Sequence, residues 1–467
     1  MGDPIRRRRL TCRGVAIVAA LATLASCAPR APRRLSHATA VETTVSYLAE
    51  RVARKEVGKY SVETHPTFDV AFVEFDDQGR LWDLEQVESM KRALASAVQR
   101  ADGAGVGIIA FAHGWEHDAR VCDEFVACFR TFLDAIAADT GAAAAAAGVG
   151  APRIVGVYLG WRGRSVVLPV ATQLTFWPRK RTAERIGAGE LVEVLEYLDL
   201  FTHRENDEGR LASLSIMGHS FGGTMVYSAL SSTLKARLVD ALERHAHAPT
   251  EENLVHGFGD LVLLINPAFE ASAFAPLHEL ADALGTCSPR QAPVLVVIGS
   301  ENDTPNRVWF RTGRWVQTFM QSTGPRSGGP LLTTAVGSYD PFITHRVESV
   351  APSRALAPRT HVSDCACELP IGELSPEESR MIGDFLRTRR FASPWGSEDV
   401  CEECEGGLTL GTARLTCLPG IIPTRPVWGV RATDDVVDGH SGFFTRPFLD
   451  FVRYLILGAL SSSTTSE

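Results

Sequence analysis

The sequence of 467 residues predicts an α/β protein with a mostly parallel central sheet and helices on both faces. Short apolar runs of strand length alternate along the chain with longer segments whose apolar residues recur every three to four positions. Several of the short runs are apolar throughout, as is typical of strands buried on both faces. Strands separated by helices imply parallel neighbours joined by right-handed crossovers.

The predicted elements follow in order from residue 69. Strands are expected over residues 69–75, 80–83, 106–112, 154–161, 211–217, 261–265, 294–298 and 427–431. Helices are expected over residues 84–100, about 118–138, 191–201, from 222 onward, and within 443–457. The first two strands form a predicted hairpin across Asp76-Asp77-Gln78-Gly79, and the alanine-rich run 141–150 is interpreted as a loop with some helical tendency.

The first 27 residues have the pattern of an export signal. Arginines at 6–9 precede an apolar stretch at 15–24, which is too short to span a membrane. Leu24-Ala25-Ser26-Cys27 follows and resembles the lipobox of bacterial lipoproteins. The resemblance implies that Cys27 is acylated, becomes the mature N-terminus and anchors the protein to a membrane. An ordinary secretory signal is the alternative.

The residue after Cys27 and the segment beyond it refine this expectation. Ala28, in place of Asp, favours the outer membrane and its periplasmic face. The Pro- and Arg-rich run 28–34 is interpreted as a flexible tether within an N-terminal segment, 28–66. Residues 67–467 are expected to form one large domain with insertions.

Charge and cysteine usage agree with an exported protein that does not bind nucleic acid. Loss of residues 1–27, with five arginines and one aspartate, moves the formal net charge from −8 to about −12. Eight cysteines remain and favour disulfides. They are Cys122, Cys128, Cys287, Cys365, Cys367, Cys401, Cys404 and Cys417. A zinc site held by Cys365, Cys367, Cys401 and Cys404, with Cys417 close by, is the alternative.

One motif points to chemistry. Gly218-His219-Ser220-Phe221-Gly222 fits the G-x-S-x-G pattern and lies between a predicted strand and a predicted helix. A sharp turn at this place lifts a serine hydroxyl to the top of a parallel sheet, and glycines are needed because side chains would collide with neighbouring elements. A plain glycine turn is the alternative. With this context the sequence resembles the α/β-hydrolase superfamily, and the resemblance implies that Ser220 is a nucleophile.

The resemblance also implies an acid and a base, in the chain order Ser, Asp or Glu, His. Asp303 follows the strand predicted at 294–298 and is the expected acid, with Glu301 as the alternative. His440 lies near the end of the chain, before the last predicted helix, and is the expected base. His345 is the reserve candidate.

The oxyanion of an acyl-transfer reaction needs two backbone N–H donors. Phe221, the residue after Ser220, is expected to supply one. His113-Gly114-Trp115 resembles the His-Gly-x oxyanion turn and makes the Trp115 amide the second, with His113 ordering the turn. A tight strand exit without a catalytic part is the alternative.

Two insertions are predicted. Residues 162–190 lie where the superfamily inserts a cap, and Phe176 and Trp177 are expected to line a substrate pocket. Core packing with a solvated basic edge at Arg179-Lys180-Arg181 is the alternative. Residues 304–425 are too long for one connection and form the expected Cys-rich insertion, tied over the site by disulfides.

The sequence thus predicts a lipid-anchored serine hydrolase for a small-molecule or lipid-like carboxylic ester, with no metal or organic cofactor. A thioesterase, peptidase or acyltransferase would use the same residues. A hydrolase-fold lipoprotein that has lost its acid or base and works by binding, and a zinc-stabilised envelope protein, are the non-enzymatic alternatives.

Overall fold

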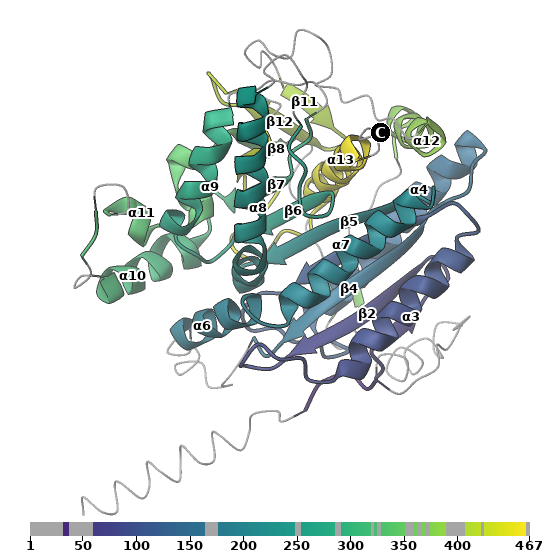
Figure 1. Ribbon diagram of the computed structural model, residues 1–467, viewed down its shortest axis with the longest axis horizontal. Helices are drawn as coiled ribbons and strands as arrows, with labels where there is room; N and C mark the ends of the chain where they lie inside the picture. Colours follow the sequence, from purple (N-terminus) through teal and green to yellow (C-terminus); the bar gives the residue numbers. More distant parts are fainter. Residues whose placement is uncertain are drawn as a thin grey trace, which may run out of the picture.

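The computed structural model describes residues 31–36, 59–163, 176–247, 254–284, 291–318, 322–324, 328–350, 359–361, 366–368, 374–388, 407–421 and 425–463. Within these residues, eleven strands form one sheet in the order β1-β2-β4-β3-β5-β6-β7-β13-β8-β12-β11. The strands from β2 to β8 in this order are parallel, and β1, β12 and β11 join them by antiparallel pairs. The chain is therefore an α/β protein with a mostly parallel sheet, as predicted (Figure 1).

Seven of the eight predicted strands are present with bounds close to those expected, and the remaining strands of the described residues were not predicted. The strands of the central sheet are β1 (Val62–Thr64), β2 (Phe68–Phe75), β3 (Val106–Ala112), β4 (Arg153–Trp161), β5 (Ala212–His219), β6 (Leu261–Ile265), β7 (Leu295–Ser300), β8 (His345–Ser349), β11 (Gly407–Leu410), β12 (Ala413–Cys417) and β13 (Val427–Ala432). A separate hairpin consists of β9 (Arg359–His361) and β10 (Ala366–Glu368).

The helices cover both faces of the sheet. They are α3 (Leu84–Arg100), α4 (Glu124–Ala147), α6 (Phe176–Gly187), α7 (Leu191–Asp207), α8 (Phe221–His247), α9 (Ala271–Leu284), α10 (Arg311–Thr318), α11 (Pro330–Thr333), α12 (Pro376–Thr388) and α13 (Arg446–Ser463), with a π-helix, η1, at Pro305–Phe310 and 3₁₀ turns η2 (Val336–Ser338) and η3 (Asp340–Phe342). Residues of α3, α6, α7, α8 and α9 pack on one face. Residues of α4 and α13 pack on the other.

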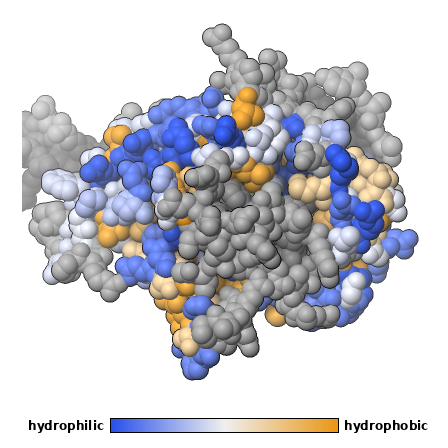
Figure 2. Space-filling model, turned by 90° about the horizontal axis from the view of Figure 1, so that it is seen from above, coloured by the Kyte–Doolittle hydropathy of each residue, from blue (hydrophilic) through white to orange (hydrophobic). Residues whose placement is uncertain are grey.

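Alternation along the strands explains the two layers. In β3, Ile108 and Ala110 belong to the first hydrophobic cluster, and Ile109 and Phe111 belong to the second. Successive strand residues point to opposite faces, and both faces are covered, so the run is apolar throughout. Where the face in Figure 2 is coloured, hydrophilic residues predominate and hydrophobic residues lie in small groups between them.

The predicted loop at residues 141–150 is wrong. Helix α4 continues through the alanines to Ala147 and ends at Gly148, whose left-handed conformation (φ 67°) caps it. Alanine has the highest helix propensity, and Ala143 and Ala144 are buried against Ile382 and Phe385 of α12. Figure 1 shows α4 and α12 side by side.

The predicted strand at residues 80–83 is also wrong. Asp83 is the N-cap of α3, where its side chain accepts a hydrogen bond from the N–H of Glu85 at 3.0 Å. Leu81 forms only an isolated bridge with Phe75. The antiparallel partner of β2 is β1, so the hairpin lies before β2 and not after it.

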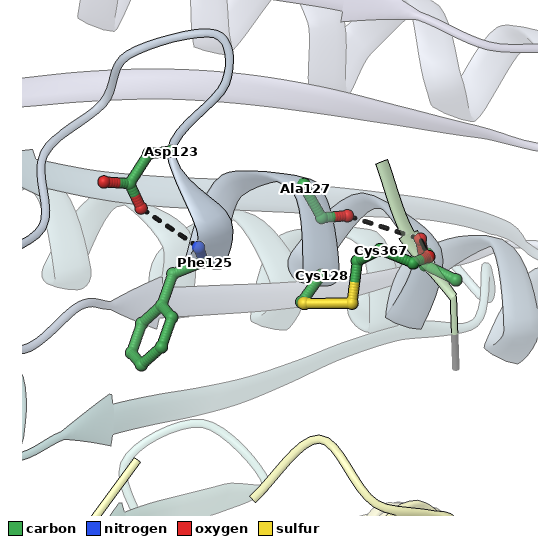
Figure 3. The surroundings of a disulfide bond; sticks show 6 residues. Asp123, Phe125, Ala127, Cys128 and Cys367 are labelled. Atoms are coloured by element: carbon green, nitrogen blue, oxygen red, sulfur yellow. Dashed lines mark hydrogen bonds between the residues drawn. A yellow bond between two sulfur atoms is a disulfide. The ribbon is translucent and has the colours of Figure 1, made fainter. Parts of the chain in front are cut away.

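The Cys-rich insertion contributes to the central sheet. Strands β8, β12 and β11 extend the sheet beyond β13. A disulfide joins Cys367 of β10 to Cys128 of α4 (Figure 3), so this part of the insertion is fixed against a helix on the flank of the sheet. Cys122 and Cys417 are disulfide-bonded as well. Cys367 cannot bind zinc as the alternative prediction required, because its sulfur is in a disulfide and is not a thiolate. Cys287, Cys365, Cys401 and Cys404 lie outside the described residues.

The interpretation of residues 28–34 as a flexible tether is wrong for its last two residues, Arg33 and Arg34. The backbone N–H groups of Arg33 and Arg34 each donate to Glu74 Oε1 at 2.9 Å. The Arg34 side chain is fully buried and donates to Glu63 Oε1 and to the carbonyl of Ala119, both at 2.6 Å. These residues are part of the folded body. Residues 1–30, with Cys27, lie outside the described residues, and among the described ones no helix has the length and apolarity needed to cross a membrane.

Candidate active site

Ser220 lies at a sharp turn between β5 and α8. Its φ of 55° is left-handed, a conformation that costs a non-glycine residue about 1–2 kcal/mol. The flanking glycines allow the turn, since a Cβ on Gly222 would lie 2.0 Å from the carbonyl oxygen of Ala112 and one on Gly218 would lie 2.7 Å from that of Gly222. The backbone N–H of Ser220 donates to the carbonyl of Ile265 in β6 at 2.9 Å. The serine is therefore fixed at the carboxyl end of the central strands, as the motif predicts.

Three predicted residues meet at this turn. His440 Nε2 lies 2.8 Å from Ser220 Oγ, and His440 Nδ1 lies 2.8 Å from Asp303 Oδ1. Ser220 and Asp303 are almost completely buried, whereas the His440 side chain is 18% exposed. A neutral imidazole in this place donates Nδ1–H to the carboxylate and accepts the serine hydroxyl at Nε2. The arrangement can take the hydroxyl proton as the oxygen attacks an electrophile.

Glu301, the alternative acid, does not contact His440. Its carboxylate forms an ion pair with Arg346 at 2.7 Å and is partly exposed. The carboxylate of Asp303 instead accepts hydrogen bonds from Asn306, by the backbone N–H at 3.1 Å and the side-chain Nδ2–H at 2.7 Å. These bonds fix the orientation of the oxygen that faces His440.

Three residues that the sequence did not single out hold this constellation. Asn306 Nδ2 also donates to the carbonyl of Asn266 at 2.9 Å. Asn266, itself left-handed at φ 43°, donates its Nδ2–H to the carbonyl of His440 at 2.8 Å. His219 Nε2 donates to the same carbonyl at 2.8 Å. Burial lowers the pKa of His219 well below its ordinary value, so the ring is neutral.

A short backbone pair shapes the loop that carries His440. The N–H of Asp438 donates to the carbonyl of Gly442 at 2.9 Å, and the N–H of Gly442 donates back at 3.1 Å. Gly439 has a φ of 60°, which favours glycine. The sequence gives only one signal for the contacts that Asn306, Asn266 and His219 make around His440. Asn266 comes directly after a strand, where a side chain reaches the edge of the sheet at which ligands bind.

The turn at His113 lies against Ser220. A Cβ on Gly114 would come within 2.7 Å of His219 Nδ1 and 2.9 Å of Ser220 Cβ, so only glycine fits. His113 is buried, accepts the Trp161 N–H at Nε2 (3.1 Å) and donates Nδ1–H to the Gly114 carbonyl (2.9 Å). Burial lowers its pKa to about 4. His113 therefore orders the turn and is not a base for Ser220.

The two predicted amide donors belong to this neighbourhood. Phe221 is the first residue of α8, where N–H groups have no acceptor within the helix. Trp115 follows Gly114 and packs edge-on against Phe176 at 5.5 Å between ring centroids. The close approach of Gly114 to Ser220 places the 113–115 backbone beside the serine.

The described part of the predicted cap is helix α6, because residues 164–175 lie outside the described residues. Phe176 contacts Phe221 at 4.8 Å between ring centroids, and Trp177 contacts Phe310 at 5.7 Å. The alternative of a solvated basic edge is wrong for two of its three residues. Arg179 is buried and paired with Asp77, and Lys180 is buried and paired with Glu270. Arg181 is exposed.

His345 and the rest of the described chain supply no competing centre. His345 is buried in β8, stacks on Trp428 at 4.1 Å and is in contact with Thr344 Oγ1. Its pKa is lowered by burial to about 3.

An apolar pocket between β3, β5, α12 and α13 lies on the other side of the sheet's length from Ser220. It includes Val106, Leu211 and Phe385 and lies at the amino ends of β3 and β5, opposite Ser220. No cluster of His, Cys, Asp and Glu in the described residues could hold a metal.

Comparison of the chain with protein-family models, with curated proteins and with solved structures gave no match.

Proposed function

We propose that the protein is a serine hydrolase of the α/β-hydrolase type that acts on a carboxylic ester. The observation that carries the proposal is the unbroken contact of Asp303, His440 and Ser220 at a left-handed strand-to-helix turn. Three residues separated by 83 and 137 positions form this contact in the chain order typical of the superfamily. A glycine turn without a catalytic role does not require a buried acid and a partly exposed histidine beside it.

In the proposed reaction Ser220 Oγ attacks the ester carbonyl carbon while His440 Nε2 takes the hydroxyl proton. Asp303 holds the tautomer with hydrogen on Nδ1 and stabilises the imidazolium that forms. The imidazolium then donates its Nε2 proton to the leaving alcohol, and an acyl-enzyme remains. A water molecule enters, and His440 Nε2 takes its proton as the water oxygen attacks the acyl carbon. The tetrahedral intermediate then collapses to the carboxylic acid as His440 returns the proton to the departing Ser220 Oγ.

The negative charge that develops on the carbonyl oxygen would be held by the N–H groups of Phe221 and Trp115. The first lies at the N-terminus of α8, where the helix dipole also favours negative charge. The second follows a glycine that contacts Ser220. Donors aimed at this oxygen each contribute about 3 kcal/mol to transition-state stabilisation in related systems.

Export and lipid anchoring at Cys27 are part of the proposal. The Cys128–Cys367 disulfide supports an oxidising compartment. The N-terminal pattern at residues 6–27 supports a lipoprotein signal. Together they favour a hydrolase held at the periplasmic side of a bacterial envelope.

Hydrolysis of p-nitrophenyl esters of increasing acyl length tests the proposed function. The assay uses the mature chain without its lipid, residues 28–467, which holds every described residue, beside Ser220→Ala and His440→Ala. Turnover that falls by orders of magnitude in both variants, with unchanged circular dichroism, supports the proposal. Absence of turnover in the folded wild-type chain at every acyl length would contradict it.

A further inference from the structure

We infer that the edge of the sheet that carries Ser220 docks on an anionic phospholipid bilayer, through a surface formed by Val308, Trp309, Arg311 and Trp315, here named the α10 surface. The inference rests on the proposed function, because it makes the substrate an ester dissolved in that bilayer. It is carried by two separate observations. One is the chemistry of the α10 surface, and the other is the place where the N-terminal segment joins the body.

The α10 surface exposes large aromatic side chains. Trp309 is 58% exposed and Trp315 is 65% exposed, and Val308 beside them is exposed too. Val308 and Trp309 lie near the end of the π-helix η1, and Arg311 and Trp315, four residues apart, share one side of α10. Large apolar side chains that are exposed together on one short segment indicate a contact surface.

The opposite side of the same segment is tied to the candidate active site. Asn306 holds Asp303, and Phe310 packs on Trp177 of α6. A Cβ on Gly313 would meet the Trp177 ring at 2.2 Å, so α10 lies directly on α6. The neighbouring residue of α6, Phe176, contacts Phe221 beside the nucleophile. A chain of packed side chains therefore joins the segment that carries the α10 surface to Phe221, the residue after Ser220.

Tryptophan together with arginine suits a lipid headgroup region. Tryptophan rings are enriched where hydrocarbon meets water, and arginine binds the phosphates of anionic lipids. Arg307 and Arg311 are both exposed next to the tryptophans. Three nearby carboxylates have arginine partners: Glu301 pairs with Arg346, Asp340 with Arg431, and Glu270 with Arg314. Asp434 accepts a hydrogen bond from Asn302. The surface presents apolar rings beside two exposed arginine side chains.

The N-terminal segment joins the body at the same edge. Arg33 and Arg34 are bound to Glu74, near the end of β2, and Arg33 pairs with Asp118, three residues after Trp115, at 3.0 Å. Leu35 and Leu84 are exposed beside this attachment. Cys27 lies six residues before Arg33, so a lipid on it is at most about 20 Å from this edge. A lipid within this reach and the α10 surface can occupy one bilayer.

Co-sedimentation with vesicles tests the inference on the lipid-free mature chain. Phosphatidylglycerol vesicles are compared with phosphatidylcholine vesicles for the wild type, for Trp309→Ser with Trp315→Ser, and for Arg311→Gln. The matched control is Leu200→Ser with Val239→Ser, two exposed apolar residues on α7 and α8. Hydrolysis of a water-soluble p-nitrophenyl ester is measured for each protein to show that the site is intact.

We expect the tryptophan pair variant to bind phosphatidylglycerol vesicles at least about tenfold more weakly, with the soluble-ester activity and the control variant unchanged. Arg311→Gln should reduce the preference for phosphatidylglycerol and its sensitivity to salt. Equal binding by the wild type and the tryptophan variant would overturn the inference. A wild-type chain that does not bind vesicles but dimerises through these tryptophans would also overturn the inference. Vesicle binding without any ester turnover would refute the proposed function and leave the docking surface standing.

Discussion

His219 Nε2 donates a hydrogen bond to the carbonyl oxygen of His440 at 2.8 Å, so the residue before the candidate nucleophile holds the backbone of the candidate base. His219 is buried and neutral because burial lowers its pKa. Asn266 Nδ2 donates to the same oxygen at 2.8 Å. His219 at the end of β5 and Asn266 directly after β6 thus hold the backbone of the loop that carries His440.

The first prediction concerns the hydrogen bond from His219 Nε2 to the carbonyl of His440. His219→Ala should lower kcat about tenfold to a hundredfold with little change in KM, because small displacements of a catalytic group are costly. His219→Gln, which keeps an amide donor, should recover part of the loss. Steady-state kinetics on a soluble ester provide the measurement. Equal kcat in the wild type and His219→Ala would show that the hydrogen bond from His219 does not position His440.

The second prediction separates the two carboxylates after β7. Asp303→Asn should lower kcat by about 10⁴, because an amide favours the wrong imidazole tautomer. Glu301→Gln should change kcat by less than about twofold, since Glu301 only pairs with Arg346 at the surface. Kinetics of the two variants at one pH make the comparison. A larger loss in Glu301→Gln than in Asp303→Asn would reverse the assignment.

The third prediction concerns the contact between Gly114 and the serine turn. Gly114→Ala places a methyl group 2.9 Å from Ser220 Cβ and 2.7 Å from His219 Nδ1. We expect a loss of about 1–3 kcal/mol in the free energy of unfolding, together with a large loss of kcat. Gly141→Ala in α4 is the control, since nothing lies within 4 Å of the new methyl group, and it should stabilise by up to about 1 kcal/mol. Urea unfolding and ester kinetics distinguish the two.

The fourth prediction concerns the disulfide between α4 and β10. Replacing Cys128 and Cys367 by alanine should lower the free energy of unfolding by about 2–5 kcal/mol, because the bond closes a loop of 239 residues. The kcat at a temperature where the variant is folded should stay within about twofold. An unchanged urea midpoint, or a kcat that falls without loss of stability, would contradict this purely structural role.

The fifth prediction concerns acid stability. Burial lowers the pKa of His345 to about 3 and that of His113 to about 4, whereas an unfolded histidine titrates near 6.5. The unfolded chain therefore binds more protons below pH 6.5, and this contribution to stability is complete above that pH and is lost as the pH falls toward 4. The free energy of unfolding should decrease steeply over that interval.

A variant tests which group is responsible. His345→Phe keeps an aromatic ring beside Trp428 and should reduce the slope of unfolding free energy against pH by up to about 1.4 kcal/mol per pH unit between pH 6 and 4.5. His247→Gln, at an exposed position of α8, is the control measured beside it. Equal slopes in wild type and His345→Phe would show that His345 is not buried neutral.

The sequence predicted the elements that depend on local pattern. The strand before Ser220, the glycines around it and the helix after it follow from apolar periodicity and from steric limits near the turn. The positions of Asp303 and His440 followed from chain order and the resemblance, and the structure brings both to Ser220. Their catalytic roles remain part of the proposal.

The contacts that sequence reasoning missed join distant residues. Asn266 and His440 are 174 positions apart, and Arg34 is buried beside Ala119, 85 positions away. A single side-chain amide or guanidinium leaves no periodic pattern in the sequence. The error in α4 was avoidable, because a run of alanines favours a helix on propensity alone. The strands β8, β11 and β12 are short, and although β11 pairs with the adjacent β12, β8 joins the sheet through partners far along the chain.

The most direct test of the central claim is the rate at which a fluorophosphonate labels Ser220, followed by mass spectrometry of the tryptic peptides. Only a serine activated by a base reacts quickly with this electrophile. We predict rapid labelling of the wild-type chain at Ser220 alone, slowing by orders of magnitude in His440→Ala and absent in Ser220→Ala. A folded wild-type chain that labels no faster than His440→Ala would contradict the claim that Asp303, His440 and Ser220 form a working catalytic triad.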